Sequence, residues 1–236
     1  MTPKPIIIAL DVETAAQARE LIAKLGDSVD FYKVGMELYA AAGPDLVREI
    51  TGQGKKVFLD MKYYDIGETV RRAVAQVAKL GVQFLTVHAV KSVMEAAVAG
   101  RGNSDLKLLA VTVLTDLNQA DILDMGYSCT VQELVAMRVK SAMTAGVDGL
   151  VCSPLEVASV RQQTGTKTIL VTPGVRSAGS DAGDQKRVAT PLAALQNGAS
   201  YLVVGRQVTR AQDPRQEVEK LFAEILEQTP LTSALT

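Results

Sequence analysis

The residues best suited to chemistry stand together at the end of one apolar run. Residues 57–59 (Val-Phe-Leu) predict a buried strand, which ends in Asp60 and Lys62, and Asp65 follows on a loop before a helix expected from Val70. Side chains alternate across a strand, so Asp60 and Lys62 project from the same face. An ammonium beside a carboxylate can supply both a positive charge and a proton. By itself, the pattern fits a structural ion pair as well as a catalytic lysine.

A second set of residues suits the binding of an anion. Gly174 stands two residues before Arg176, and Gly205 directly precedes Arg206. Glycine allows backbone N–H groups to approach an anion, and arginine supplies a planar fork of donors. The sequence therefore predicts a phosphorylated small-molecule substrate.

Both sets are carried by short apolar runs that alternate with amphipathic segments. Strands are predicted at 6–11, 31–35, 56–61, 84–88, 108–114, 149–153, 168–172 and 201–205. Helices are predicted between them at 15–25, 43–51, 70–80, 93–99, 131–145, 155–163, 190–196 and 214–228. Eight βα units in 236 residues match a (β/α)8 TIM barrel, which takes about 250 residues. A doubly wound open sheet is the alternative, because local patterns do not report closure. No linker interrupts the chain, so we expect a single domain over residues 1–236.

The barrel prediction brings the charged residues together, because the active site of this fold lies at the C-terminal ends of the strands. Asp11 ends the first predicted strand, and Lys33 lies inside the otherwise apolar second one. A lysine there needs a partner, and Asp11 and Asp60 on the two flanking strands are the nearest candidates. The position favours a functional array over its alternative, a salt-bridge network that closes the barrel top. The loops after strands seven and eight, which carry Arg176 and Arg206, are where such barrels often hold phosphate.

Composition argues against several other classes of protein. The chain is 47% hydrophobic and 22% charged, with a net charge of -1, which gives no reason to expect nucleic acid as a partner. No apolar run approaches the roughly 20 residues of a membrane span, and the N-terminal apolar stretch is short for a signal peptide. His88 is the only histidine, and Cys129 and Cys152 have no metal-ligand spacing. We expect a cytoplasmic protein with reduced thiols and no membrane partner, whose proton chemistry depends on lysine and aspartate.

The segment between the two arginines is small, polar and rich in glycine. It covers residues 177–187 and is too long for a tight βα turn. Beside a binding site, such a segment predicts a mobile lid, although a disordered surface loop has the same composition.

Several motifs together carry a family resemblance. Asp-x-Lys-x-x-Asp-Ile-x-x-Thr stands at 60–69, and the other motifs are Leu-Asp at 10–11, Lys-Val-Gly at 33–35, Thr-Pro-Gly-Val-Arg at 172–176, Gly-Asp-Gln at 183–185 and Gly-Arg at 205–206. The first pattern is shared with a wider group of decarboxylases, whereas the combination is highly specific. Nearly from end to end, the chain resembles the orotidine 5'-monophosphate decarboxylases of the short bacterial type.

The resemblance implies a reaction and an assembly. The reaction would convert orotidine 5'-phosphate to uridine 5'-phosphate without cofactor or metal. Lys62 would protonate the carbon that loses CO2, Asp60 would lie near the departing carboxylate, and Lys33 and Asp65 would complete the charged array. Asp65 and Thr69 would reach into the partner's site in a homodimer.

The resemblance also implies the residues that bind the nucleotide. Asp11 and Lys33 would hold the ribose hydroxyls, and Thr115 would lie against the nucleotide. The remaining substrate-binding positions would be Pro173, Arg176, Gln185, Gly205 and Arg206, the last four at the phosphate and Gln185 on the lid. Ser177 and Gln207 depart from the family, which usually has prolines beside the two arginines.

Two other functions compete with this one. The nearest is a Mg2+-dependent decarboxylase or aldolase of the wider group that acts on a sugar phosphate and uses the same Asp-x-Lys-x-x-Asp pattern. The other is a non-catalytic barrel that binds a phosphate or nucleotide, which would tolerate the loss of Lys62.

Overall fold

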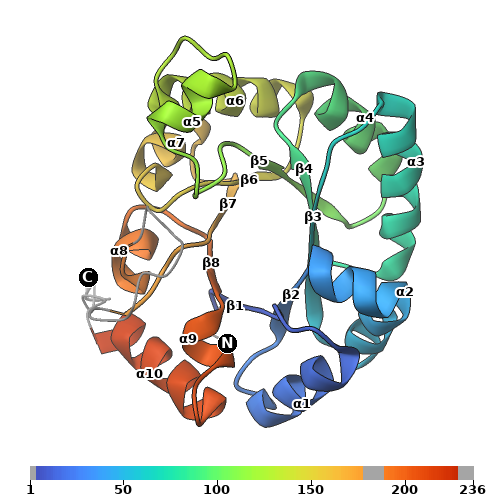
Figure 1. Cartoon of the computed structure of the whole chain (residues 1–236), viewed down its shortest axis with the longest axis vertical. Helices are drawn as coiled ribbons and strands as arrows, with labels where there is room; N and C mark the ends of the chain where they lie inside the picture. Colours follow the sequence, from blue (N-terminus) through green and yellow to red (C-terminus); the bar gives the residue numbers. More distant parts are fainter. Residues whose placement is uncertain (1–3, 178–188, 228–236) are drawn as a thin grey trace, which may run out of the picture.

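Eight short apolar strands pair in parallel and close into a barrel (Figure 1). The structure, a computed structural model, describes residues 4–177 and 189–227. The strands are β1 (Ile6–Ala9), β2 (Phe31–Gly35), β3 (Lys56–Tyr63), β4 (Phe84–His88), β5 (Lys107–Val111), β6 (Gly149–Val151), β7 (Ile169–Thr172) and β8 (Tyr201–Val204). They neighbour one another in chain order, and β1 pairs with β8 through Ile6 and Leu202. This last pairing closes the sheet, which confirms the (β/α)8 TIM barrel over the open sheet.

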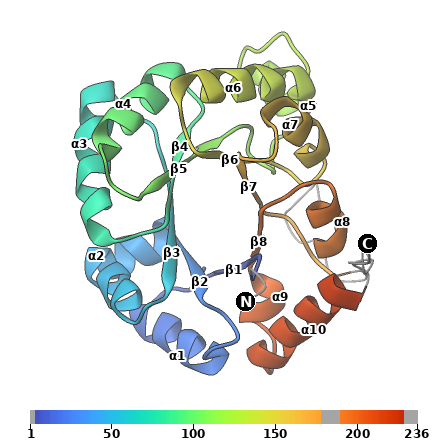
Figure 2. The ribbon, with the colours of Figure 1, turned by 180° about the vertical axis from the view of Figure 1, so that it is seen from behind.

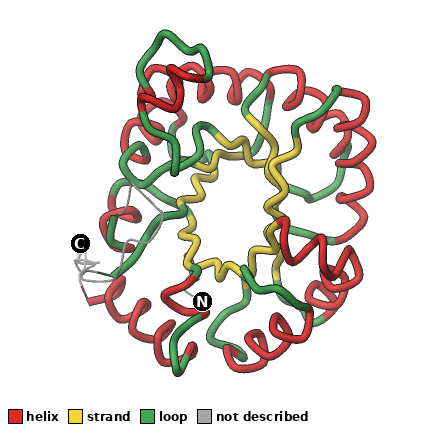
Figure 3. Tube along the Cα trace, in the orientation of Figure 1, coloured by secondary structure: helices red, strands yellow, loops and turns green. Residues whose placement is uncertain are grey.

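The helices form a ring around the barrel, which is seen from both ends in Figures 1 and 2 and as a trace in Figure 3. They are α1 (Ala15–Leu25), α2 (Met36–Gly52), α3 (Gly67–Val77) with the 3-10 turn η1 (Ala78–Leu80), α4 (Lys91–Arg101), α5 (Gln119–Asp124), α6 (Val131–Ala145), α7 (Val157–Thr164), α8 (Pro191–Gln196), α9 (Arg206–Thr209) and α10 (Pro214–Glu227). The ring covers the outer face of every strand, so the strands are apolar on both faces.

Alternation along each strand divides the core into two layers. Outward-facing residues such as Ile6 and Ile8 pack against the helices, whereas Ile7 belongs to a second cluster that fills the barrel interior. Aromatic rings dominate this inner cluster: the centroids of Phe31 and Phe84 lie 5.1 Å apart, and those of Phe58 and Phe84 lie 6.0 Å apart. The rings fill the lower part of the barrel interior and form a floor beneath its C-terminal end.

The structure changes some of the predicted bounds. The helix expected at 43–51 is the second segment of α2, which is kinked at the non-helical Gly43 before Pro44, and the first segment, from Met36, was not predicted. The short helices α5 and α9 were not predicted, and β3 runs to Tyr63 rather than to residue 61. Strand and helix order otherwise follow the prediction.

In the described ranges, no helix is long and apolar enough to cross a membrane. The predicted lid at 177–187 falls almost entirely outside the described residues, as does Gln185. The expectation of one domain over residues 1–236 stays a prediction.

Candidate active site

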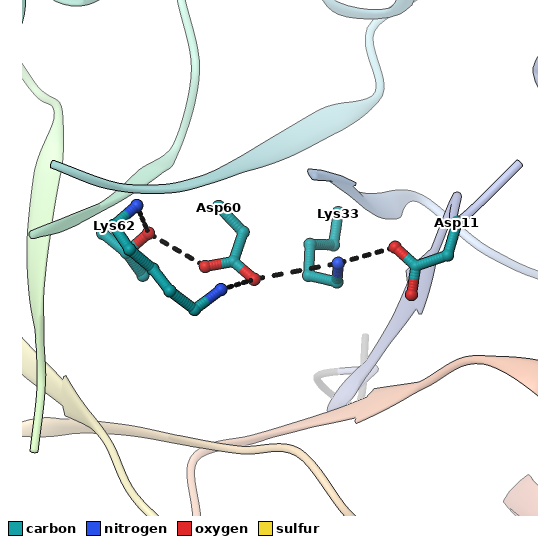
Figure 4. A network of polar contacts seen from close by, with 5 residues as sticks. Asp11, Lys33, Asp60 and Lys62 are labelled. Carbon is teal, nitrogen blue, oxygen red and sulfur yellow. Dashed lines mark hydrogen bonds and ion pairs between the residues drawn. The ribbon is translucent and has the colours of Figure 1, made fainter. Parts of the chain in front are cut away.

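Four charged side chains lie in a row across the C-terminal ends of the first three strands (Figure 4). The Lys33 ammonium lies 2.8 Å from Asp11 Oδ1 and 3.7 Å from Asp60 Oδ2. On the other side of the same carboxylate, Lys62 Nζ lies 2.9 Å from Asp60 Oδ2. The row therefore alternates in sign, and both partners predicted for Lys33 are confirmed.

The two-residue period of the strands places this row directly above the aromatic floor. Phe31 and Phe58 point into the barrel, so Lys33 and Asp60, two residues further along β2 and β3, point in the same direction one layer higher. Gly35 leaves room for the ion pair between Lys33 and Asp11. A Cβ at this position would lie 3.2 Å from Lys33 Nζ and 3.4 Å from Asp11 Oδ1.

Burial makes the charges of the row interact strongly. The side chains of Lys33 and Asp60 are only 12% and 14% exposed. Burial alone raises the pKa of Asp60, but the charges of Lys33 and Lys62, with hydrogen bonds from Lys62 and Thr86, outweigh burial and lower this pKa below its usual value. Asp60 is therefore a carboxylate at neutral pH, and it holds an ammonium on either side.

The backbone at Lys62 adopts a conformation that is unusual for a residue other than glycine. Its φ of 48° lies in the left-handed region, and the register between β3 and β4 shifts between Leu59 and Tyr63. Strain of this kind costs about 1–3 kcal/mol and persists only where the surroundings enforce it. One contact that enforces this conformation is the hydrogen bond that Lys62 N donates to Thr86 Oγ1 at 2.9 Å.

Thr86 is a site residue that sequence reasoning missed. It is completely buried, and its hydroxyl also donates to Asp60 Oδ1 at 2.9 Å. One side chain on β4 thus orients the Asp60 carboxylate and fixes the backbone of Lys62. The available signal was a hydroxyl in the middle of an otherwise apolar strand, where it needs partners.

The row lines one side of a cavity of about 480 Å³ at the C-terminal end of the barrel. This volume is that of a small-molecule site. The predicted site residues that line the cavity are Asp11, Lys33, Asp60, Lys62, Thr115, Pro173, Arg176, Gly205 and Arg206. The fold thus gathers nine predicted positions from six strand ends.

Positive charge gathers where the β7 and β8 loops border the cavity. Arg176 and Arg206 both line it, and Arg210, which sequence reasoning did not single out, joins them after α9. Gly174 has a φ of 78°, a conformation that suits glycine in a tight loop. Three guanidinium groups at one side of a small cavity are suited to a phosphate.

Two predicted site residues do not line this cavity in the part of the chain that the structure describes. Asp65 and Thr69 are exposed and are not among its lining residues in the described part of the chain. Asp65 Oδ1 instead accepts the backbone N–H of Ile66 at 2.6 Å. Gln185 lies outside the described residues.

His88 lies at the end of β4 but is also absent from the lining residues that the structure describes. Burial, together with the charges of Arg138 and Lys62, lowers the pKa of this imidazole. Its ring centroid lies 5.4 Å from that of Tyr64. A neutral, packed histidine outside the cavity lining suits a structural role.

The comparisons with known proteins point in one direction. A family model described as orotidine 5'-phosphate decarboxylase / HUMPS family matches residues 4–221. A protein of Nitrobacter winogradskyi named orotidine 5'-phosphate decarboxylase is 51% identical, over 93% of this chain and 92% of its own. One of Rhodopseudomonas palustris (strain BisB5), with the same name, is 53% identical over 95% of both chains.

Solved structures agree with these relatives. The crystal structure of orotidine 5'-phosphate decarboxylase from Lactobacillus acidophilus superposes with a TM-score of 0.84 at 38% identity, covering 95% of this chain and all of the other. An uncharacterized conserved protein from Geobacillus kaustophilus gives 0.82 at 32% identity, over 94% of this chain and all of the other. The chain belongs to the orotidine 5'-phosphate decarboxylase / HUMPS family.

Proposed function

We propose that this protein is a carboxy-lyase that converts orotidine 5'-phosphate to uridine 5'-phosphate and CO2, the last step of de novo UMP synthesis. One observation carries the proposal: the alternating row of Asp11, Lys33, Asp60 and Lys62 shares a single cavity with Arg176 and Arg206. An array for carbanion chemistry and a set of donors for a phosphate thus face the same small space. The curated relatives carry the same name.

The reaction breaks the bond between the pyrimidine ring and its carboxylate. CO2 leaves, and the electron pair stays on a ring carbon that has no conjugated sink for it. The Lys62 ammonium would stabilise this charge and then deliver a proton to the carbon. Asp60 would lie near the departing carboxylate. Because Lys62 and Asp60 are mostly buried, their charges act with little screening by water.

The other proposed roles concern substrate binding. Asp11 and Lys33 would hold the ribose hydroxyls, and Thr115 and Pro173 would lie against the nucleotide; all four line the cavity. Arg176, Gly205 and Arg206 would bind the phosphate, and Gln185 joins them by resemblance only. No cofactor is part of the proposal.

The active assembly would be a homodimer in which Asp65 and Thr69 enter the partner's site. Both residues are exposed and outside this chain's own cavity, as a contribution to another site requires. Tyr64 and Ile66, which flank Asp65, are 68% and 77% exposed. Large apolar side chains that project beside a charged site residue support an interface at this edge.

The location would be the cytoplasm, because a phosphorylated nucleotide does not cross a bilayer unaided. Nucleic acid and membrane are not proposed as partners, given a net charge of -1.

A Mg2+-dependent enzyme acting on a sugar phosphate is the nearest competitor. Magnesium sites are built on carboxylates with free oxygens. Asp60 Oδ1 accepts a hydrogen bond from the Thr86 hydroxyl, and Oδ2 accepts one from Lys62 Nζ. Lys33 Nζ lies 3.7 Å from the same Oδ2. A cation at Asp60 would have to displace two ammonium groups, which favours the metal-independent decarboxylase.

The test follows the ultraviolet absorbance of orotidine 5'-phosphate with purified protein and excess EDTA. We expect the substrate band to disappear at a rate proportional to enzyme concentration. Activity on a sugar phosphate with Mg2+, and none on the nucleotide, would move the chain to the competing function. No activity on either would leave a phosphate-binding barrel.

A further inference from the structure

The two arginine-bearing loops are joined to each other by the residues that directly follow the arginines. Ser177 follows Arg176, and Gln207 follows Arg206. The backbone N–H of Ser177 donates to Gln207 Oε1 at 3.2 Å, and Gln207 Nε2 donates to Ser177 Oγ at 2.9 Å. The two residues thus exchange hydrogen bonds in both directions between loops that are 30 residues apart in sequence.

The same pair is anchored to α10. Gln207 Nε2 donates to Glu217 Oε1 at 2.9 Å, and Ser177 Oγ donates to Glu224 Oε2 at 2.6 Å. Glu217 and Glu224 are seven residues apart, or about two turns, so they share one face of the helix. Two carboxylates on α10 therefore hold Ser177 and Gln207 in place.

The hydrogen-bonding capacity of the pair is almost completely used. Both protons of the Gln207 amide have acceptors, and its oxygen accepts a backbone N–H. The Ser177 hydroxyl donates once and accepts once. Bonds to charged carboxylates are the stronger kind, and part-buried bonds are less screened by water. The connection fixes each partner's rotamer and hence the backbone next to each arginine.

We propose that Ser177 and Gln207, supported by Glu217 and Glu224, are positioning residues that hold Arg176 and Arg206 at the spacing needed to share one phosphate. The inference rests on the proposed function, because it needs the two arginines to bind that group. A site binds its ligand more tightly when the binding groups are held in place before the ligand arrives. Helix α10 thereby becomes part of the phosphate site although Glu217 and Glu224 do not line the cavity.

The test measures what the phosphate contributes to binding. Inhibition constants are determined for uridine 5'-phosphate and for uridine, and the ratio of the uridine constant to the uridine 5'-phosphate constant isolates what the phosphate contributes. We expect Ser177→Ala and Gln207→Met each to reduce this ratio by about tenfold, the equivalent of one hydrogen bond of roughly 1.4 kcal/mol. The double variant should reduce the ratio by less than the product of the two single-variant factors, because both substitutions remove the same connection.

Two variants provide controls. Glu219→Gln alters an exposed ion pair with Arg215 on the same helix, and we expect it to leave the ratio unchanged, whereas Glu217→Gln should lower it. Ser177→Thr keeps the hydroxyl and should restore most of the ratio that Ser177→Ala loses. Thermal unfolding of each variant checks that it is folded. If Gln207→Met does not fold, the result for Ser177→Ala decides the test.

Arg176→Ala separates this inference from the proposed function. If Arg176→Ala collapses the ratio but the Ser177 and Gln207 variants leave it unchanged, the connection is merely structural and the inference is wrong. If Arg176→Ala also leaves the ratio unchanged, the assignment of the phosphate site fails, and the inference with it.

Discussion

Thr86→Val removes the single hydroxyl that joins Asp60 to the backbone of Lys62. Valine has nearly the same shape, so the change deletes two hydrogen bonds, each 2.9 Å long, without opening a cavity. Thr86 is fully buried, so water cannot replace the lost partners. The Lys62 N–H would be left unsatisfied in its left-handed conformation.

The size of the effect follows from the two bonds. A hydrogen bond to a charged group contributes about 1.5–3 kcal/mol, and an unsatisfied buried N–H costs about 1–3 kcal/mol. We therefore expect the free energy of unfolding to fall by roughly 2.5–6 kcal/mol. If about 1.4–2.8 kcal/mol of this also stabilises the transition state, kcat falls roughly 10- to 100-fold.

The assay is steady-state decarboxylation at saturating substrate, paired with urea unfolding. Thr112→Val is the matched control: Thr112 is equally buried, but its hydroxyl donates to the Val151 carbonyl, away from the charged row. We expect the control to lose stability while keeping kcat within about twofold, since it removes one neutral hydrogen bond. A Thr86→Val enzyme with undiminished kcat, or with a loss no greater than the control's, would refute the reasoning.

Three further predictions concern stability. Because the pKa of Asp60 is lowered in the folded protein, its ionisation stabilises the fold above the unfolded pKa of about 3.9 and stops doing so as pH falls through the lower folded value; the difference in unfolding free energy between the wild type and Asp60→Asn should therefore shrink below about pH 4. Gly100→Ala would place a Cβ 2.3 Å from the backbone oxygen of Arg71 on the neighbouring helix, so we expect a loss of about 1–3 kcal/mol in urea unfolding, whereas Gly52→Ala, with open space around it, should lose nothing. Arg161 donates to three backbone carbonyls, and Arg161→Lys, which has no planar fork, should lower unfolding free energy by roughly 1–3 kcal/mol; an unchanged melting temperature would contradict this role.

The charged row could be predicted from sequence because it needs only alternation along each strand and the pairing of consecutive parallel strands. Alternation along a strand places Lys33 and Asp60 on the inner face, and parallel neighbouring strands bring their C-terminal ends together. Closure of the barrel could not be predicted in this way, since the β1–β8 pairing joins segments that no local pattern connects.

Thr86 and the pair of Ser177 and Gln207 show where sequence reasoning stops. The contacts of Thr86 depend on a register shift between β3 and β4 and on the left-handed φ of Lys62, neither of which has a sequence signature. The sequence shows Ser177 and Gln207 only as departures from the prolines that are usual in the family. Their connection arises from loop conformations and from the side of α10 that faces them.

Lys62→Ala tests the central claim most directly, namely that the Lys62 ammonium performs the chemistry. The measurement is kcat at saturating orotidine 5'-phosphate, with the affinity for uridine 5'-phosphate as a check on the binding site. We expect turnover to be abolished while the phosphate, held at the arginine side of the cavity, still anchors the product. A Lys62→Ala protein that is folded, binds the product and decarboxylates the substrate at the wild-type rate would contradict the account.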